Sequence, residues 1–268
     1  MPQMIDCETV ANLIRETAHT LIMPRFRALD SGDIREKKPG DLVTIADIET
    51  ERALTRRLGD IAAGVQVIGE EGVAEDPQRL ALLSLDEPVW IIDPVDGTAN
   101  FARGEPGFAV IVALARQGAV QSGWIYDPVN DRMIHAARGE GAWSEGRRLA
   151  VAAELPADQI TGSAYGRAKS GQRAAKALSA SDRIRAVENR GSSGLEYIAL
   201  AEGRSQFSLH SRSLPWDHAA GMLIVSEAGG QAAFLDGTPY DARIPDRPLL
   251  AAASAAGWRA VSEIIANS

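Results

Sequence analysis

Acidic residues stand at the ends of apolar segments, where a folded chain could bring them together. Glu70 follows an apolar run that ends at residue 68, and Asp93 and Asp96 follow a second run that ends at residue 92. Asp217 stands where a helical pattern begins. Functional side chains often gather where the strands of an α/β sheet end, because the loops there face a solvent-filled crevice. The four carboxylates are therefore candidate ligands of one site.

The segment that follows residue 92 favours a tight turn. Pro94 fixes its own φ angle and Gly97 permits backbone conformations that other residues avoid, so Asp93 and Asp96 can point to the same place. Carboxylates packed this closely repel each other unless cations lie between them. Two Mg²⁺ ions would balance the four acids, and oxygen ligands favour Mg²⁺ or Mn²⁺ over Zn²⁺. The pattern predicts a divalent-metal site.

Each acid also has a purely structural interpretation. Asp-Pro and Asp-Gly pairs are common in turns. Glu70 with Glu71 could close a solvated strand, and Asp217 could serve only as a helix N-cap. The structural interpretation is weakest for Asp93, because the strand before it is expected to be buried and an unpaired carboxylate at a buried edge is costly.

Several other chemistries lack their motifs in this sequence. There is no G-x-G-x-x-G or Walker loop for nucleotide phosphates, and no G-x-S-x-G for a serine nucleophile. The single cysteine, Cys7, cannot form an internal disulfide or a thiolate metal cage. The four histidines show no metal-ligand spacing such as H-E-x-x-H. Oxygen ligands therefore remain as the expected donors.

Composition indicates a globular protein. The 268 residues are 45% hydrophobic and 24% charged, and 36 acidic against 28 basic residues give a net charge of −8. An acidic surface argues against a non-specific nucleic-acid-binding protein. No apolar run reaches the roughly 18 residues of a membrane span, and Asp6 and Glu8 stand where a signal peptide would need apolar residues. We therefore expect a soluble, cytoplasmic protein with no nucleic-acid or membrane partner.

Periodic patterns predict the elements that would position the acids in the first half of the chain. Apolar residues at helical spacing predict a helix over residues 5–29, and Thr44 with Asp47 resembles the capped start of a second helix. Residues 65–68 alternate as in a strand. The continuous apolar run at 89–92 predicts a strand that is buried on both faces.

The pattern changes along the rest of the chain. Apolar runs separated by turn residues predict an antiparallel meander between residues 108 and 151. Strand-like and helix-like segments then alternate, at 184–187, 195–201, 207–209, 217–228 (a helix), 231–235, 249–253 and a terminal helix. An antiparallel front half and an alternating back half predict stacked layers of helices and sheets. We expect an N-terminal α+β part over residues 1–152 and a C-terminal α/β part over 153–268.

Five stretches of the sequence carry motifs that are specific only in combination. They are Asp41-Leu42-Val43-Thr44 leading to Asp47, Ile68-Gly69-Glu70-Glu71, Asp93-Pro94-Val95-Asp96-Gly97-Thr98 with Asn100-Phe101, Gly191-Ser192-Ser193, and Trp216-Asp217 with Glu227-Ala228-Gly229-Gly230. In this order the chain resembles the inositol monophosphatase family of metal-dependent phosphomonoesterases over most of its length. The resemblance implies a layered α/β/α/β/α sandwich, with an antiparallel sheet in the N-terminal half and a mixed sheet in the C-terminal half.

The resemblance also implies a set of Mg²⁺ ligands. A first ion would be held by oxygen atoms of Glu70, Asp93, Val95 (its carbonyl) and Thr98. Asp93 would bridge to a second ion, which Asp96 and Asp217 also bind, and a third, weaker site near Glu70 is usual in the family. In such two-metal catalysis one ion lowers the pKa of a bound water and the other stabilises the leaving oxygen.

Other residues take their implied roles from the same resemblance. Thr98 and Asp47 would orient or deprotonate the attacking water, which is a general-base role. Without the resemblance, Asp47 would be interpreted as a first-turn helix acid and Thr98 as an N-cap. Phosphate would be bound beside Asp96 by the backbone N–H groups of Gly97 and Thr98 at a helix start. A substrate-contacting turn would comprise Gly191, Ser192 and Ser193.

One expected substrate contact differs from the family pattern. Inositol-cleaving relatives usually carry a Glu seven residues before the position of Asp217, where it binds sugar hydroxyls, and this chain has His210. A histidine removes an acceptor carboxylate and can add a donor. Ser193 and Gly194 also stand where small alanines are frequent. These departures weaken the prediction of inositol as the substrate but leave phosphoryl hydrolysis untouched.

The resulting prediction is Mg²⁺-dependent hydrolysis of a small phosphomonoester, with inositol 1-phosphate as the lead substrate. Histidinol phosphate, a sugar phosphate or a nucleoside 3′,5′-bisphosphate are alternatives on the same fold. A haloacid-dehalogenase-like phosphatase needs one residue between its two acids, whereas two separate Asp93 from Asp96. A non-catalytic partner-binding protein with the family fold is the alternative of another class. A homodimer and inhibition by Li⁺ are expected from the resemblance.

Overall fold

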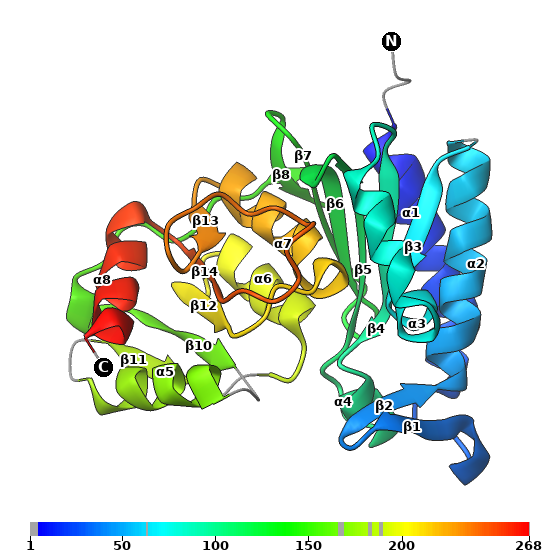
Figure 1. Cartoon of the computed structure of the whole chain (residues 1–268), viewed down its shortest axis with the longest axis horizontal. Helices are drawn as coiled ribbons and strands as arrows, with labels where there is room; N and C mark the ends of the chain where they lie inside the picture. The colour runs from blue at the N-terminus through cyan, green and yellow to red at the C-terminus, as the bar shows by residue number, and fades with distance from the viewer. Residues whose placement is uncertain (1–4, 63, 166–168, 182–183, 188–189, 268) are drawn as a thin grey trace.

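The computed structural model describes residues 5–62, 64–165, 169–181, 184–187 and 190–267. Its α-helices are α1 (Cys7–Thr17), α2 (Ile45–Ile61), α3 (Glu70–Glu75), α4 (Thr98–Ala102), α5 (Lys169–Ala180), α6 (Ser193–Ala201), α7 (Pro215–Glu227) and α8 (Ala255–Ala266). Helices α1 and α2 cover one face of a large sheet, α6 and α7 lie between that sheet and a smaller one, and α5 and α8 cover the far side (Figure 1). The expected α/β/α/β/α sandwich is confirmed.

The larger sheet has seven strands in chain order. They are β3 (Gln66–Gly69), β4 (Val89–Asp96), β5 (Ala109–Arg116), β6 (Ala119–Asp127), β7 (Arg132–Ala137), β8 (Gly141–Ser144) and β9 (Arg147–Arg148). Strands β5 to β9 form the expected antiparallel meander and β4 pairs antiparallel with β5, but β3 pairs parallel with β4. The sheet is therefore mixed at this edge, because the chain between β3 and β4 crosses over through α3 and the 3₁₀-helix η4 (Pro77–Ser84) instead of turning back directly.

Strand β4 is buried on both faces, as the apolar run at 89–92 predicts. Trp90 and Ile92 pack into the core beneath α1 and α2, whereas Val89 and Ile91 pack into the core that includes α7. Alternate side chains of a strand point to opposite faces of the sheet, so a strand between two helical layers must be apolar at every position. The polar residues of β4 are therefore the two acids at its carboxyl end.

The smaller sheet carries the C-terminal half of the chain. Its strands, in spatial order, are β11 (Arg185–Val187), β10 (Thr161–Tyr165), β12 (Phe207–His210), β14 (Leu249–Ala252) and β13 (Gln231–Phe234). Strand β10 pairs parallel with β11 and β12, and the other pairs are antiparallel, so the expected mixed sheet is confirmed. Strand β10 and helix α5 were not among the elements expected from the sequence, although the apolar residues of α5 recur on one side of the helix.

Helix α7 lies between the two sheets and has little polar surface. Most of its residues are buried, including the run from Ala219 to Val225. Gly123 of β6 faces Ala220 so closely that an added Cβ would lie 2.7 Å from the Ala220 Cα atom. Small residues at this contact let α7 approach the larger sheet. The close packing fixes the N-terminal end of α7, which carries Asp217.

The chain before the larger sheet departs from the expected single helix over 5–29. Helix α1 continues as a π-helical turn, η1 (Ala18–Ile22), and a 3₁₀ turn, η2 (Met23–Arg25). A further 3₁₀ turn, η3 (Ser31–Asp33), leads into a hairpin of β1 (Ile34–Lys38) and β2 (Asp41–Thr44) that the sequence analysis did not predict. The hairpin lies beside α4 at the edge of the larger sheet (Figure 1).

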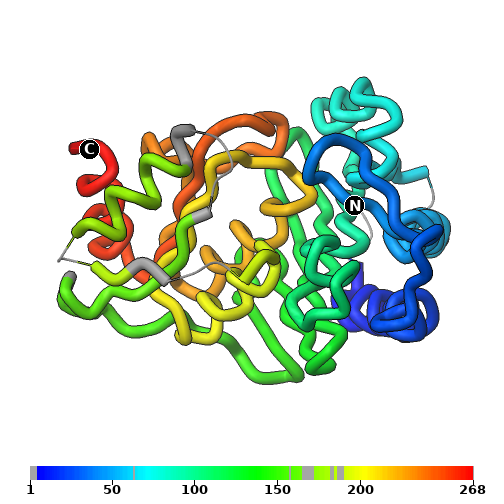
Figure 2. Tube along the Cα trace, turned by 90° about the horizontal axis from the view of Figure 1, so that it is seen from below, coloured from blue at the N-terminus to red at the C-terminus, as the bar shows by residue number. Residues whose placement is uncertain are grey.

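The two halves of the chain lie side by side in both views (Figures 1 and 2), with the C-terminus at the outer end of the C-terminal half. The boundary expected near residue 152 falls between β9 and the 3₁₀ turn η5 (Ala157–Gln159), outside both sheets. The division into two domains there stays a prediction. Within the described ranges, the helices are all too short or too polar to cross a membrane.

Candidate active site

A bulge in β4 brings two acids to one side of the strand. Asp93 pairs with Ile111 and Asp96 pairs with Ala109, so the bulged strand has one more residue than its partner between these pairs. In a regular strand two residues three apart would point to opposite faces, and the extra residue of a bulge reverses this. Pro94 fits there, because proline cannot donate a ladder hydrogen bond.

Asp217, from the first turn of α7, completes a cluster with these two acids. One ligand oxygen from each of Asp93, Asp96 and Asp217 lies within 4.8 Å of the others. Asp93 is 1% exposed, and the Asp217 side chain is 27% exposed. Burial raises the pKa of all three carboxyls, and the charges of the neighbouring acids raise the pKa of Asp93 and Asp217 further. A cation between the three oxygens would remove this repulsion.

Glu70 begins α3 beside the cluster, and its carboxylate is bound to a lysine. Lys37 Nζ lies 2.7 Å from Glu70 Oε1 and 2.9 Å from Glu71 Oε1. Burial by itself lowers the pKa of Lys37, but the two carboxylates outweigh it and raise the pKa. The β1–β2 hairpin, which carries Lys37, is thereby tied to the acidic end of β3.

Asp96 is held by the N-terminus of α6. It accepts hydrogen bonds from Ser192 Oγ at 2.5 Å, from the Gly194 N–H at 2.7 Å, and from Ser193 through Oγ at 3.0 Å and N–H at 3.2 Å. The hydroxyls of Ser192 and Ser193 are thus engaged with Asp96. Gly191, with φ 79°, precedes this turn. A direct contact of these residues with a substrate stays a prediction.

Asp47 and Thr98 lie together next to the cluster. The Thr98 hydroxyl is 3.1 Å from Asp47 Oδ1 and 3.0 Å from the carbonyl oxygen of Val95, and it can donate to one of them at a time. Asp47 also accepts two hydrogen bonds from Thr44, one from its N–H at 2.8 Å and one from its Oγ1 hydroxyl at 2.6 Å. These bonds belong to the capping box that begins α2. Burial is the main cause that raises the pKa of Asp47, to about 7. Such a carboxyl can exchange a proton near neutral pH.

Gly97 lets the chain turn from β4 into α4. Its φ is 98°, and a Cβ added there would lie 2.5 Å from the carbonyl oxygen of Gly107 and 3.1 Å from that of Gly191. A residue with a Cβ is strained at this φ even where there is room for the side chain. Here the backbone of two other segments also occupies the space that the Cβ would need. The close approach therefore requires glycine at this position.

We expect Gly97→Ala to destabilise the protein more than Gly229→Ala does. Gly229 has a similar φ of 92° but no atom within 4 Å of an added Cβ, so it isolates the cost of the backbone conformation, about 1–3 kcal/mol. The clash with Gly107 adds to that cost at Gly97. Denaturant unfolding of both variants measures the difference, and equal free energies of unfolding would contradict the clash.

His210 is buried in a cluster of aromatic side chains. Its Nε2 lies 2.7 Å from Ser208 Oγ, and its ring centroid is 5.5 Å from that of Tyr197 and 4.6 Å from that of His218. Burial lowers the pKa of His210 to about 4, so the ring is neutral at pH 7. His218 follows Asp217 directly in α7, so the aromatic cluster lies next to the acidic one. A contact between His210 and a substrate stays a prediction.

Two residues at the site were missed by the sequence analysis. Lys37 had no signal, because a lysine in a short polar hairpin is usually a solvated charge. The Glu51 carboxylate accepts hydrogen bonds from the N–H groups of Glu71 and Gly72, each at 2.8 Å. These bonds fix the start of α3, which carries Glu70. Its position one helical turn after Asp47, on the same face of α2, was a usable signal.

The donor set fits a hard divalent cation. Carboxylate oxygens of Asp93, Asp96 and Asp217 converge, and the Glu70 carboxylate and the Val95 carbonyl lie around them. Mg²⁺ prefers such all-oxygen surroundings. Helices α2, α3, α4, α6 and α7 all begin at this site. The positive ends of their helix dipoles favour negative charge, which suits an anionic substrate such as a phosphate ester.

Comparison with known proteins gives a consistent result. The sequence matches the model of the inositol monophosphatase family over residues 6–267. The inositol-1-monophosphatase of Bacillus subtilis is 33% identical over 208 residues, which are 76% of this chain and 77% of that protein. A Thermotoga maritima protein named fructose-1,6-bisphosphatase/inositol-1-monophosphatase is 32% identical over 232 residues, 86% of this chain and 85% of its own. The solved structure of a T. maritima IMPase covers 97% of this chain and 96% of its own, with a TM-score of 0.81 and 27% identity.

Proposed function

Because the chain belongs to the inositol monophosphatase family and is therefore a phosphatase, we propose that it hydrolyses inositol 1-phosphate with the help of Mg²⁺. The observation that carries this proposal is the convergence of three carboxylates from β4 and α7 within 4.8 Å, two of them buried and the third partly buried. Acids held this close are costly without a cation between them. The name of the B. subtilis relative supports the choice of substrate.

The proposed ligands divide between two ions. A first Mg²⁺ would be held by Glu70, Asp93, the Val95 carbonyl and Thr98. A second would be held by Asp93, Asp96 and Asp217, and a third, weaker one would lie near Glu70. Bound Mg²⁺ supplies a water of lowered pKa and charge that stabilises the leaving oxygen. Lys37 Nζ lies 2.7 Å from Glu70 Oε1, so the lysine competes with the ion for this oxygen.

The residues around the ions would place the water and the phosphate. The Thr98 hydroxyl accepts a hydrogen bond from the attacking water and donates one to Asp47 Oδ1. As the water attacks, its proton passes to the Thr98 oxygen and the hydroxyl proton of Thr98 passes to Asp47. Thr44 fixes the other oxygen of Asp47, so the carboxylate keeps its orientation toward Thr98. The N–H groups of Gly97 and Thr98 at the start of α4 would bind phosphate oxygens, with Asp96 beside them.

We expect Asp47→Asn to lower kcat for phosphate release by about 10²–10⁴-fold, the usual contribution of a general base. A helix-capping acid alone would affect stability by about 1 kcal/mol and leave kcat unchanged. Asp60→Asn serves as the control, because Asp60 is an exposed acid of the same helix. Steady-state kinetics of both variants distinguishes the roles, and a kcat for Asp47→Asn close to that of the wild type would reject the base.

A sugar bisphosphate is a second candidate substrate. His210 is neutral at pH 7, so it would not repel a second phosphate as a glutamate at that position would. The name of the T. maritima relative combines fructose-1,6-bisphosphatase with inositol-1-monophosphatase activity. Histidinol phosphate and nucleoside bisphosphates are chemically possible at the same metal site, but no feature of the described residues favours them.

Phosphate release from purified protein tests the proposal directly. Inositol 1-phosphate, fructose 1,6-bisphosphate and histidinol phosphate are compared at equal concentration, each with Mg²⁺ and with EDTA. We expect release from inositol 1-phosphate that depends on Mg²⁺. A higher kcat/KM for the bisphosphate would favour the second candidate, and equal rates in EDTA would reject the metal mechanism. The homodimer, inhibition by Li⁺ and a cytoplasmic location stay predictions.

A further inference from the structure

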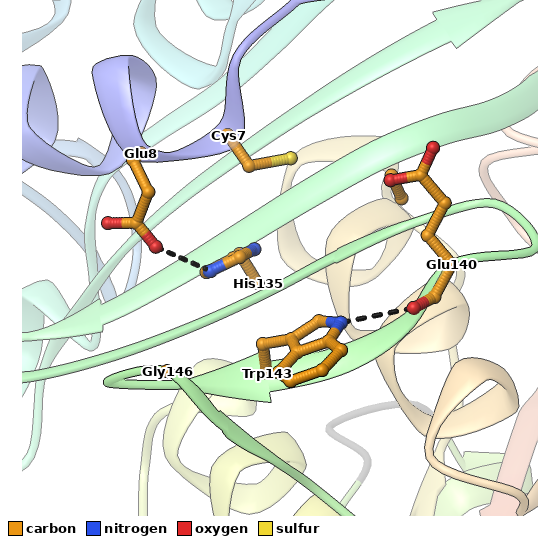
Figure 3. Close-up of a pocket in the computed structure, with 7 residues that line it drawn as sticks. Cys7, Glu8, His135, Glu140, Trp143 and Gly146 are labelled. Atoms are coloured by element: carbon orange, nitrogen blue, oxygen red, sulfur yellow. Dashed lines mark hydrogen bonds and ion pairs between the residues drawn. The ribbon is translucent and has the colours of Figure 1, made fainter.

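A second cavity lies on the larger sheet, away from the acidic cluster. It has a volume of about 170 Å³ and is lined by Cys7, Glu8, His135, Ala137, Glu140, Trp143 and Gly146 (Figure 3). His135 is on β7, and Trp143 pairs with it from β8. Trp124 of β6, the other neighbour of His135, packs beneath α1 and α2, whereas α7 with Asp217 covers the opposite face of the sheet. The two sites are therefore separated by the sheet.

His135 carries a buried nitrogen without a partner. The residue is 8% exposed, and among the described residues nothing hydrogen-bonds to its Nδ1. Its other nitrogen, Nε2, lies 3.4 Å from Glu8 Oε1. If Nε2 carries the proton toward that carboxylate, Nδ1 presents a bare lone pair. Unsatisfied buried polar atoms are rare in folded proteins, and an ion that binds there is one explanation.

The thiol of Cys7 is a soft donor that lines the same cavity as His135. Trp124 Nε1 donates to the Cys7 carbonyl oxygen at 3.0 Å, which fixes the start of α1 over β6 and beside β7. Figure 3 shows the Cys7 side chain above the His135 ring, with the Glu140 side chain on the far side of the cavity. Burial, followed by the charges of Glu140, Asp6 and Glu8, raises the pKa of the thiol to about 11. The thiol is therefore protonated at pH 7, and several carboxylates surround it.

The polar groups around this cavity are mostly acceptors. They are the Nδ1 lone pair of His135 and the carboxylates of Glu8 and Glu140, with the thiol as the fourth group. A cavity of this kind favours a cation. Sulfur and imidazole donors select Zn²⁺ and related transition metals over Mg²⁺. The mixed donor set therefore differs in kind from the all-oxygen set at Asp93, Asp96 and Asp217.

We propose that Cys7 and His135, completed by the carboxylates of Glu8 and Glu140, form a second metal site that takes Zn²⁺ or a similar divalent transition-metal ion. On binding, the S–H bond of Cys7 breaks, its proton leaves to solvent, and a sulfur–metal bond forms without a change of oxidation state. Glu8 has a side chain that is 64% exposed and Glu140 is also exposed, so both can turn toward the ion. The side chains must move, because the donors around this cavity are too far apart in the described structure. Among the described residues, only Asp93, Asp96 and Asp217 form a group of three or more Asp, Glu, His or Cys donors within 4.8 Å of one another.

The bound ion would join α1 to the β7–β8 hairpin. In the described structure Glu8 already contacts His135 across these two elements, and Arg15 of α1 forms ion pairs with Asp131 and Glu145 at the ends of β7 and β8. A metal held by Cys7 and His135 would add two coordinate bonds between α1 and the hairpin. We therefore expect the site to act on the stability of the N-terminal helix and to leave the phosphatase reaction unchanged.

Co²⁺ provides a direct probe, because Co²⁺–thiolate coordination produces a charge-transfer absorption. The chain has a single cysteine, so such an absorption reports on Cys7 alone. The full-length protein is first saturated with Mg²⁺ to occupy the acidic cluster and is then titrated with Co²⁺. We expect the band to appear with one equivalent, and Zn²⁺ to remove it by competition.

Three variants complete the test. Cys7→Ser should abolish the band, and His135→Ala should weaken Co²⁺ binding at least about tenfold. His19→Ala is the matched control, because His19 is an exposed histidine that contacts Tyr126 and does not line the cavity. If Cys7→Ser does not fold, protection of Cys7 in the wild type from a thiol reagent by Zn²⁺ gives the same information. Absence of the band in the wild type, or unchanged affinity in His135→Ala, overturns the proposal.

Discussion

Asp217→Asn is expected to lower kcat/KM for phosphate release by at least about 1,000-fold while the protein stays folded. A metal ion contributes several kcal/mol to the stabilisation of a transition state, and each 1.36 kcal/mol is a factor of ten in rate. Asp217 is one of the three converging carboxylates, and an amide oxygen is a weaker ligand without charge. Steady-state kinetics over a range of Mg²⁺ concentrations measures the loss. A near wild-type rate in Mg²⁺ would show that the metal assignment is wrong.

The same substitution should stabilise the metal-free protein. Burial and the charges of Asp96 and Glu70 raise the pKa of Asp217, which means that its ionised form is disfavoured in the folded state. Removing one charge from this cluster relieves repulsion. We expect a higher melting temperature than for the wild type in EDTA and a lower one in Mg²⁺. A purely structural role for Asp217 would lower both.

Asp96→Asn is the informative comparison. In the sequence, Asp96 and Asp217 are equivalent candidates, both expected to bind the second ion. The structure separates them, because Asp96 accepts four hydrogen bonds from residues 192–194 at the start of α6. An amide accepts through its oxygen only, so donors in this turn lose their partner. We therefore expect Asp96→Asn to lose both activity and stability.

Two acids of the site, Asp47 and Glu71, should each make the metal-free protein less stable as the pH rises from about 4 to about 8. Burial raises the pKa of Asp47 from 3.8 to about 7, and burial followed by the charge of Glu70 raises that of Glu71 from 4.5 to about 8. Between its unfolded and folded pKa values, each group holds a proton in the folded state that the unfolded chain has released. The contribution of these two acids to stability is therefore greatest at low pH and falls through this window, whereas His210, whose pKa burial lowers to about 4, contributes in the opposite direction below about pH 6.5. Asp47, which is fully buried, accounts for about 4 kcal/mol of the change.

Chemical denaturation in EDTA, from pH 4.5 to pH 8.5, measures this slope. Mg²⁺ should oppose it, because the ion binds the ionised carboxylates and stabilises the folded state most at high pH. Asp47→Asn should flatten the slope in EDTA, since the amide does not titrate, and Asp60→Asn should leave it unchanged. If the difference in stability between the wild type and Asp47→Asn did not change with pH, Asp47 would be shown to be ionised in the folded state.

Local features of the site followed from short stretches of sequence. Thr44 and Asp47 form the expected capping box at the start of α2. The apolar run at 89–92 became a strand buried on both faces, and the acids after it point to one place. The chemistry of such features lies within a few neighbouring residues, namely proline and glycine geometry, capping and periodicity, so the sequence indicates them directly.

Contacts between distant segments were decided by the tertiary structure alone. Lys37 binds Glu70 across 33 residues, and Ser192 binds Asp96 across 96. No periodic pattern reports such pairs, because they depend on how whole elements pack. Among them, the closeness of Asp217 to β4 was expected from its place at the start of a helical pattern and from the family resemblance, but it is the packing of α7 against the sheet that produces it.

The amino-acid sequence by itself determined the layered fold class, the acidic residues available to a metal, and the turns that let two of them face the same way. These depend on hydrophobic periodicity and backbone geometry, which act over a few residues. Tertiary structure alone decided that β3 runs parallel to β4, that Glu70 is paired with Lys37, and that His210 is buried and neutral. Burial and charge at a given atom depend on everything packed around it, so they exist only in the folded protein.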